Sequence, residues 1–283
     1  MSDTAAPAPP TSASASAVAF IGGGNMASAL IGGLLAQGMA PAQIEVVEPA
    51  EAARSSLLAR FGITAQALPG PQLRDADLVV WAVKPQVFRE AALQARPLTS
   101  AALHLSVAAG IRSSSIAQWL GTERVVRAMP NTPALIGRGM SALFARNAVD
   151  ALECKRVEQL MAPTGETLWV TQEPLLDAVT ALSGSGPAYV FYFLEAMTRA
   201  GTSMGLSETQ AHRLAVGTFA GAAELARQSD ESPEVLRQRV TSKGGTTHAA
   251  IESMEHAGIA DALVRAIEAA QQRARELGDE FGT

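Results

Sequence analysis

Aromatic residues, lysine and cysteine are scarce in this chain of 283 residues. Its one cysteine, Cys154, excludes an internal disulfide, and an aromatic content of 5% argues against the stacking platforms that bind single-stranded nucleic acid. Basic residues number 22 against 27 acidic ones, for a net charge of −5 without a basic cluster, which argues against binding nucleic acid or an anionic membrane. No apolar run reaches the roughly 20 residues that cross a bilayer. We therefore expect a cytoplasmic protein that acts on a small molecule.

The first sixteen residues differ from the rest because nearly all of them are Ala, Pro, Ser or Thr. This composition predicts a disordered tail over residues 1–16. A secretory signal would need a basic start and an apolar core. The segment has neither, so we do not expect export.

Residues 17–172 alternate short β-branched runs with Ala- and Leu-rich stretches of helical length. The runs are nearly continuously apolar, which is typical of parallel strands covered by helices on both faces. We therefore predict an α/β fold with a mostly parallel, Rossmann-type sheet, its strands at 18–21, 44–47, 78–83, 103–107 and 125–128. One crossover helix is expected from Met26 to Gln37, closed by Gly38, and another begins at Pro85.

Residues 173–283 show no further strand signals, and their apolar residues recur at helical spacing. We predict an all-helical domain with helices over 187–204, 207–228, 247–256 and 260–277, and with helix starts at Ser207 and at Ser232–Pro233. Several inward positions are Ala or Gly, among them Gly217 and Gly221. These small residues fit an intramolecular bundle and a two-fold subunit interface equally well.

A glycine-rich segment joins the first predicted strand to the first predicted helix. Gly22 permits a tight turn, Gly24 lets a pyrophosphate approach the backbone, and Ala27 takes the third position of the dinucleotide fingerprint. The free N–H groups at the helix start, together with the helix dipole, favour an anion. The segment therefore predicts a nicotinamide dinucleotide site, in which the cofactor supplies the chemistry.

Glu48, at the end of the second strand, is the acidic residue that such a site places near the adenosine ribose. Its carboxylate can accept hydrogen bonds from the 2′-hydroxyl and would repel a 2′-phosphate, which favours NADH over NADPH. Arg54 follows shortly after and could still bind a 2′-phosphate. The alternative is that Glu48 is only a solvated charge.

Three further segments follow predicted strands and are expected at the same edge of the sheet. Residues 82–85 include Lys84, one of only three lysines, which faces the cofactor or an anionic substrate unless it is an ordinary exposed charge. Residues 107–109 are small enough to leave room for the nicotinamide ribose. Residues 129–133 contain two prolines and are predicted to be extended, as a rigid pocket wall or an ordinary connection.

Two glycine-rich segments interrupt the helical half. In residues 183–187, a turn followed by a helix start is a sufficient explanation. Residues 240–247 are denser in hydroxyls, and their two glycines free backbone N–H groups in front of a helix. Helix capping would need only one of these hydroxyls, so we expect a site for a carboxylate. The four histidines are scattered, and no metal site is predicted.

Six motifs in this order resemble those of one family, the pyrroline-5-carboxylate reductases, over residues 17–277. They are FIGGGNMASAL at 20–30, AVKPQ at 82–86, SVAAGI at 106–111, RAMPNTPALIGRG at 127–139, DAVTALSGSGPAYV at 177–190 and VTSKGGTT at 240–247. The resemblance implies a Rossmann domain over 17–172 and a helical dimerisation and substrate domain over 173–283. It also implies NAD(P)H-dependent reduction of 1-pyrroline-5-carboxylate to L-proline, the last step of proline biosynthesis, by a homodimer that can assemble further into a decamer.

The resemblance further implies functional residues. Ser242 and Thr247 would be catalytic, and the substrate would contact Ser242, Gly244, Gly245, Thr246 and Thr247. The cofactor, NADPH or NADH, would contact Ile21, Gly22, Gly23, Gly24, Asn25, Met26, Glu48, Ala82, Val83, Lys84, Pro85, Val107, Ala108 and Ala109. Two positions depart from the family pattern: Lys243 replaces a usual proline, and Glu48 replaces a small hydroxyl residue common in NADPH-dependent members.

The implied mechanism relies on orientation. A protonated imine is already electrophilic, so hydride transfer to the ring carbon needs no strong general acid. We expect backbone N–H groups of residues 242–247 to bind the substrate carboxylate and Thr247 to hydrogen-bond the ring nitrogen. The alternatives are another imine or β-hydroxyacid reductase that uses NAD(P)H, and a non-catalytic NAD(P)-binding regulator.

Overall fold

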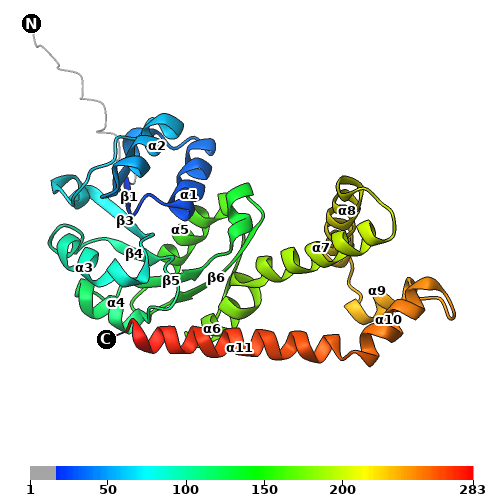
Figure 1. Cartoon of the computed structure of the whole chain (residues 1–283). Coiled ribbons are helices and arrows are strands. Elements are labelled where there is room, and N and C mark those ends of the chain that lie inside the picture. The colour runs from blue at the N-terminus through cyan, green and yellow to red at the C-terminus, as the bar shows by residue number, and fades with distance from the viewer. Residues whose placement is uncertain (1–16, 283) are drawn as a thin grey trace, which may run out of the picture. The chain divides into compact units, whose positions relative to one another are not determined.

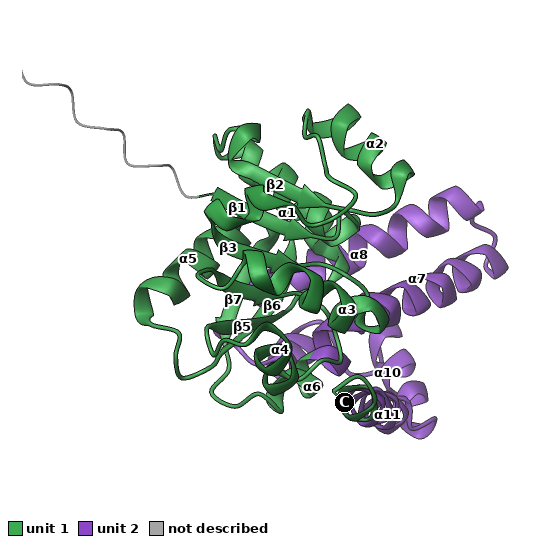
Figure 2. Cartoon of the chain, turned by 90° about the vertical axis from the view of Figure 1, so that its left-hand side faces the viewer, with its two compact units in different colours: residues 1–179, 275–283 green, residues 180–274 purple. Residues whose placement is uncertain are grey.

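The computed structural model describes residues 17–282, so the predicted tail over residues 1–16 lies outside the described part of the chain. The chain is divided into two compact units (Figures 1 and 2). Unit 1 holds the residues up to Val179 together with those from Arg275 onward, and unit 2 holds Thr180–Ala274. The domain boundary at residue 172 stays a prediction.

Unit 1 is built on a seven-stranded sheet with the order β2-β1-β3-β4-β5-β6-β7. Its strands are β1 Ala17–Ile21, β2 Ile44–Val47, β3 Ala76–Trp81, β4 Leu103–Ser106, β5 Val125–Met129, β6 Gly139–Ala145 and β7 Gly165–Trp169. All neighbours are parallel except β5 and β6, which run antiparallel. The mostly parallel, Rossmann-type sheet is confirmed, and β6 and β7 are two strands that were not predicted.

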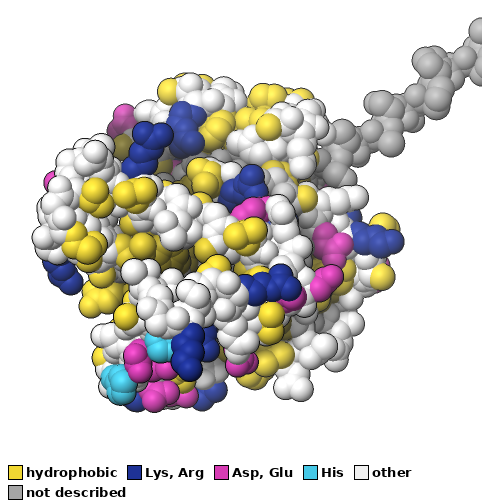
Figure 3. Space-filling model, turned by 90° about the vertical axis from the view of Figure 1, so that its right-hand side faces the viewer, with side chains coloured by type: hydrophobic (Ala, Val, Ile, Leu, Met, Phe, Trp, Pro, Cys, Tyr) yellow, Lys and Arg dark blue, Asp and Glu magenta, His cyan; other side chains and the backbone are white. Residues whose placement is uncertain are grey.

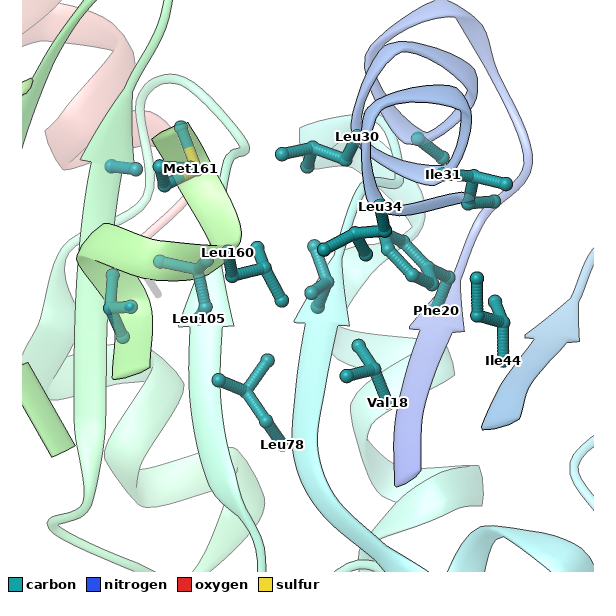
Figure 4. Close-up of a cluster of buried hydrophobic side chains, with 14 of the residues drawn as sticks. Val18, Phe20, Leu30, Ile31, Leu34, Ile44, Leu78, Leu105, Leu160 and Met161 are labelled. Carbon is teal, nitrogen blue, oxygen red and sulfur yellow. The ribbon is translucent and has the colours of Figure 1, made fainter. Parts of the chain in front are cut away.

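Helices bury both faces of this sheet. They are α1 Asn25–Ala36, α2 Glu51–Phe61, α3 Pro85–Ala95, α4 Ser113–Leu120 and α5 Ala151–Met161. On one face, Figure 4 shows side chains from β1, α1 and the end of α5, such as Phe20, Leu34 and Leu160, pointing toward one another. A second buried cluster includes the rings of Phe88 and Trp119, whose centroids lie 5.9 Å apart. Burial on both faces explains why most positions in these strands are apolar.

The segment after β5 departs from its predicted conformation. Asn131 is extended, but a short 3-10 helix, Thr132–Ile136, begins immediately after it. The prediction of an extended stretch over residues 129–133 is therefore wrong from Thr132 onward. Pro133 lies in the first turn of that helix, where a fixed φ and a missing N–H group are tolerated.

Unit 2 is helical, as predicted. Its helices are α7 Gly186–Ser203, α8 Glu208–Gln228, α9 Pro233–Arg239, α10 Thr246–His256 and the greater part of α11 Ile259–Glu280. The hydroxyl of Ser207 caps α8 and that of Ser232 caps α9, each accepting a backbone N–H at 3.3 Å, which confirms both predicted helix starts. No helix in the described part of the chain is long and apolar enough to cross a membrane.

The glycine-rich segment before α7 is not a turn. A π-helical stretch, Thr180–Gly184, follows α6 Leu175–Val179 directly, and the N–H of Ser185 donates to the carbonyl of Thr180 at 2.8 Å. The turn predicted over residues 183–187 is therefore wrong. Ser185 separates this stretch from α7, and Pro187 lies in the first turn of α7, where a missing N–H group is tolerated.

Among the glycines of α7 and α8, only Gly201 allows the two helices to approach each other closely. A Cβ atom added to Gly201 would lie 2.7 Å from the Cβ of Ala211 on α8. Gly217 and Gly221 are exposed instead, and a Cβ atom on either would meet nothing within 4 Å. Within the chain, these two glycines therefore bring no helices together.

Candidate functional site: a dinucleotide cleft and a hydroxyl-rich loop

The turn between β1 and α1 has the geometry of an anion-binding loop. Gly22 has a φ of +100°, and an added Cβ atom would lie 2.5 Å from the carbonyl oxygen of Ala82, so only glycine fits. No side chain caps α1, and a Cβ atom on Gly24 would meet nothing within 4 Å. The helix start therefore faces open space with backbone N–H groups and a favourable dipole, which fits a pyrophosphate.

A cavity of about 270 Å³ lies beside this turn, at the point where the chain passes from β2 on one side of β1 to β3 on the other. Such switch points, at the carboxyl ends of parallel strands, are where open α/β sheets bind ligands. The strand ends contribute Ile21, Gly22, Val47, Pro49 and Val83. The opposite walls are Ala67, Leu68 and Pro69, and Val87, Glu90, Ala91 and Gln94 of α3. A mostly apolar cavity next to an anion-binding helix start fits the base of a dinucleotide.

Glu48 stands in the sequence between Val47 and Pro49, which line this cavity, and its side chain does not point freely into solvent. Its carboxylate accepts the N–H of Gly23 through Oε2 at 2.7 Å and the N–H of Ala50 through Oε1 at 2.8 Å. The half-buried side chain thus ties the end of β2 to the glycine-rich turn. Arg54 approaches the same place, because its Nη1 donates to the backbone carbonyls of Glu48 and Pro49. The carboxylate has lone pairs left for a ribose hydroxyl.

The other predicted cofactor residues lie at the ends of β3 and β4. The N–H of Ala82 donates to the carbonyl of Ile21 at 2.8 Å, which places residues 82–85 beside the glycine-rich turn. Lys84 immediately precedes α3 and is exposed. The N–H of Val107 donates to the carbonyl of Trp81 at 3.1 Å, which keeps residues 107–109 at the same edge. The structure therefore brings all of the predicted cofactor residues to one edge of the sheet.

Unit 1 contains a buried ionic network that no sequence pattern indicated. Arg127 on β5 is 4% exposed and donates to Glu173 at 2.7 Å, and the N–H and hydroxyl of Ser113 donate to the same carboxylate. Burial raises the pKa of Glu173, but the hydrogen bonds from Ser113 and Arg127 outweigh it and hold the pKa below its usual value. Arg112 binds Asp177 of α6 at 2.9 Å. Two arginines thus fix the segment that leads into unit 2.

His104 on β4 is a second buried polar group that the sequence did not indicate. It is 1% exposed, and its Nδ1 accepts the indole N–H of Trp81 at 3.1 Å. Burial lowers its pKa to about 4, so the ring is neutral at pH 7. In the described part of the chain, no cluster of His, Cys, Asp and Glu residues could hold a metal ion.

The hydroxyl-rich loop of unit 2 leads into α10. Gly244 has a φ of +74°, and the N–H of Gly245 donates to the carbonyl of Ser242 at 3.0 Å, so the loop is a tight turn. No side chain caps α10, although Thr246 and Thr247 begin it. Its hydroxyls therefore do not serve as a helix cap, which favours the anion-binding interpretation. Of the five predicted substrate residues, Ser242, Gly244 and Gly245 lie in this turn, and Thr246 and Thr247 follow it directly as the first residues of α10.

Known proteins resemble both halves of the chain. Residues 173–277 match the family model "Pyrroline-5-carboxylate reductase dimerisation", and residues 17–110 match "NADP oxidoreductase coenzyme F420-dependent". Over 267 residues the chain is 45% identical to the pyrroline-5-carboxylate reductase of Pseudomonas aeruginosa, which covers 94% of this chain and 98% of that protein.

Solved structures agree with this match. A pyrroline-5-carboxylate reductase from Coxiella burnetii has a TM-score of 0.86 at 36% identity, over 93% of this chain and 98% of that one. The Plasmodium falciparum pyrroline carboxylate reductase with NADP bound has a TM-score of 0.83 at 27% identity, with the same two coverages. The chain therefore belongs to the pyrroline-5-carboxylate reductase family of NAD(P)H-dependent oxidoreductases.

Proposed function

We propose that this enzyme reduces 1-pyrroline-5-carboxylate to L-proline with NADH or NADPH, as the last step of proline biosynthesis. The observation that carries the proposal is the pair of uncapped helix starts, one behind a glycine-rich Rossmann turn and one behind a hydroxyl-rich loop. The first suits the pyrophosphate of a dinucleotide, and the second suits a small carboxylate. The relatives from Pseudomonas aeruginosa and Coxiella burnetii carry the name of this activity.

Unit 1 would hold the cofactor. The N–H groups at the start of α1 would bind the pyrophosphate, and the apolar cavity would take the adenine ring. Glu48 would accept a hydrogen bond from the adenosine ribose, and the small residues 107–109 would leave room for the nicotinamide ribose. The reduced nicotinamide supplies the hydride when the cofactor is bound.

The loop of residues 242–247 would hold the substrate. Backbone N–H groups at the start of α10 would bind the carboxylate, helped by the hydroxyls of Ser242 and Thr246. Thr247 would hydrogen-bond the ring nitrogen and so fix the face of the imine that is presented. The imine carbon gains the hydride and the nitrogen keeps its proton, which balances the reduction without a strong acid in the chain.

A homodimer is the assembly that we propose, with residues 173–283 as the dimerisation and substrate domain. Unit 2 exposes large apolar side chains such as Phe191 (59%), Tyr192 (70%) and Leu214 (58%). Hydrophobic side chains reach the surface among polar ones on the face drawn in Figure 3. Exposure of this kind is typical of a subunit interface, as are Gly217 and Gly221, which pack against nothing within the chain. A decamer and a cytoplasmic location stay predictions.

The test is turnover with purified protein. Loss of NADH or NADPH absorbance should require added 1-pyrroline-5-carboxylate, and proline should accumulate in equal amount. Cofactor binding without turnover would favour a non-catalytic regulator, and turnover only with other cyclic imines would favour a different imine reductase. Ser253 is exposed on α10 and lies outside the loop, so Ser253→Ala is the control for substitutions of residues 242–247.

A further inference from the structure

The apolar cavity beside the glycine-rich turn has a polar side, and that side belongs to α3. Glu90 and Gln94 both line the cavity, one helical turn apart. Gln94 donates from Nε2 to Oε1 of Glu90 at 3.2 Å. The remaining lining residues are apolar or glycine. Among the side chains of the cavity wall, only this exposed pair can therefore form hydrogen bonds.

The hydrogen bond between the two side chains orients the glutamine. A carboxylate can only accept, so the amide nitrogen of Gln94 must face Glu90, and the amide oxygen faces the other way. The pair then offers oxygen acceptors: the amide oxygen of Gln94 and the second carboxylate oxygen of Glu90. A ligand with an amino group on its ring edge can donate to such a pair, whereas a ligand with a ring carbonyl would place oxygen against oxygen.

Adenine and hypoxanthine differ in this respect. Adenine has an amino group at position 6 and an acceptor at N1, and hypoxanthine has a carbonyl at position 6 and an N–H at N1. We infer that Glu90 and Gln94 read the base of the cofactor and select adenine by accepting from its 6-amino group. The inference rests on the proposed function, because it takes the cavity as the place of the base.

The experiment compares the binding of NADH with that of reduced nicotinamide hypoxanthine dinucleotide, by fluorescence titration without substrate. The unsubstituted enzyme should bind NADH more tightly by roughly 5- to 100-fold, the range for one good base-reading contact. Gln94→Leu should lower the ratio of the two Kd values several-fold, mainly by weakening NADH, because it removes one of the two acceptors and leaves the carboxylate of Glu90. Glu90→Gln should lower the ratio by strengthening the hypoxanthine analogue, because an amide pair can turn to donate to the carbonyl.

Gln118→Leu, on the exposed face of α4 away from the cavity, is the matched control and should leave the ratio unchanged. Thermal unfolding of each variant checks that loss of binding is not loss of fold. Equal affinities for the two dinucleotides in the unsubstituted enzyme, or a ratio that Gln94→Leu does not change, would overturn the inference. Failure to bind either dinucleotide would instead overturn the proposed cofactor site.

Discussion

Replacing Glu48 by glutamine is the sharpest test of how the enzyme chooses between NADH and NADPH. Glutamine keeps the length of the side chain and one oxygen that can still accept the N–H of Gly23, which the carboxylate accepts at 2.7 Å. It removes the negative charge that would face a 2′-phosphate. Glu48→Gln should therefore raise kcat/KM for NADPH relative to NADH.

The size of this effect follows from electrostatics. At a separation of about 6 Å and an effective dielectric constant of about 40, between surface and bulk values, two unit charges repel by about 1.4 kcal/mol. A phosphate monoester carries a charge of about −1.5 to −2, so the repulsion is about 2–3 kcal/mol before screening. Physiological salt, with a Debye length of about 8 Å, halves it, which corresponds to roughly a 10-fold change in the ratio. At about 0.01 M ionic strength the change should grow to roughly 40-fold.

The assay measures kcat/KM for both cofactors at the two ionic strengths. Glu51→Gln, which removes the same charge from an exposed residue at the start of α2, is the control and should change the ratio by less than 2-fold, as expected for screened, exposed charges. Arg54→Ala tests the competing role of the arginine, whose Nη1 is already bound to the backbone at the end of β2. A strong NADPH preference in the unsubstituted enzyme, or a ratio that Glu48→Gln leaves unchanged at both salt concentrations, would refute the reasoning.

Three further predictions follow from other parts of the molecule. Thr247→Ala should lower kcat by roughly 10- to 100-fold if the hydroxyl orients the ring nitrogen, and an unchanged kcat would remove it from the mechanism. Burial lowers the pKa of His104 to about 4, against 6.5 when unfolded, so below pH 6.5 the unfolded chain takes up a proton that the fold does not. Because of this difference in proton uptake, the free energy of unfolding should fall by about 3 kcal/mol between pH 6.5 and 4. His104→Gln, which keeps an acceptor for Trp81, should flatten that part of the pH dependence in urea titrations, and an equally steep profile would contradict the assignment. Glu173→Ala leaves Arg127 buried without its partner and should lower the free energy of unfolding by about 3–5 kcal/mol at pH 7. A loss under 1 kcal/mol would show that the pair contributes little.

The strands that could be predicted from the sequence are those that a local run of apolar residues marks. β1 to β5 are mostly apolar because helices cover both faces, and such runs are visible along the chain even where Glu45, His104 or Arg127 interrupts one. β7, by contrast, has no buried residue, and its residues alternate between half-buried and exposed at the edge of the sheet. Its sequence, GETLW, therefore lacks the apolar run that marked the others.

The cofactor site was predicted only where a motif marks it. The turn at Gly22 was found because its φ of +100° demands glycine, and that demand is written in the sequence. Leu68, Val87 and Gln94 carry no motif, and they meet only because β1, β2 and β3 are neighbours in the sheet. Glu48 was placed correctly at the end of β2, but its bond to the glycine-rich turn depends on that same tertiary arrangement.

Transfer of an isotope from cofactor to product tests the central claim most directly. NADH carrying deuterium at both C4 positions of the nicotinamide would be incubated with enzyme and 1-pyrroline-5-carboxylate, and the proline would be analysed by mass spectrometry. The account predicts one deuterium per proline, on the ring carbon that formed the C=N bond. Proline without deuterium, or oxidation of NADH without proline, would contradict it.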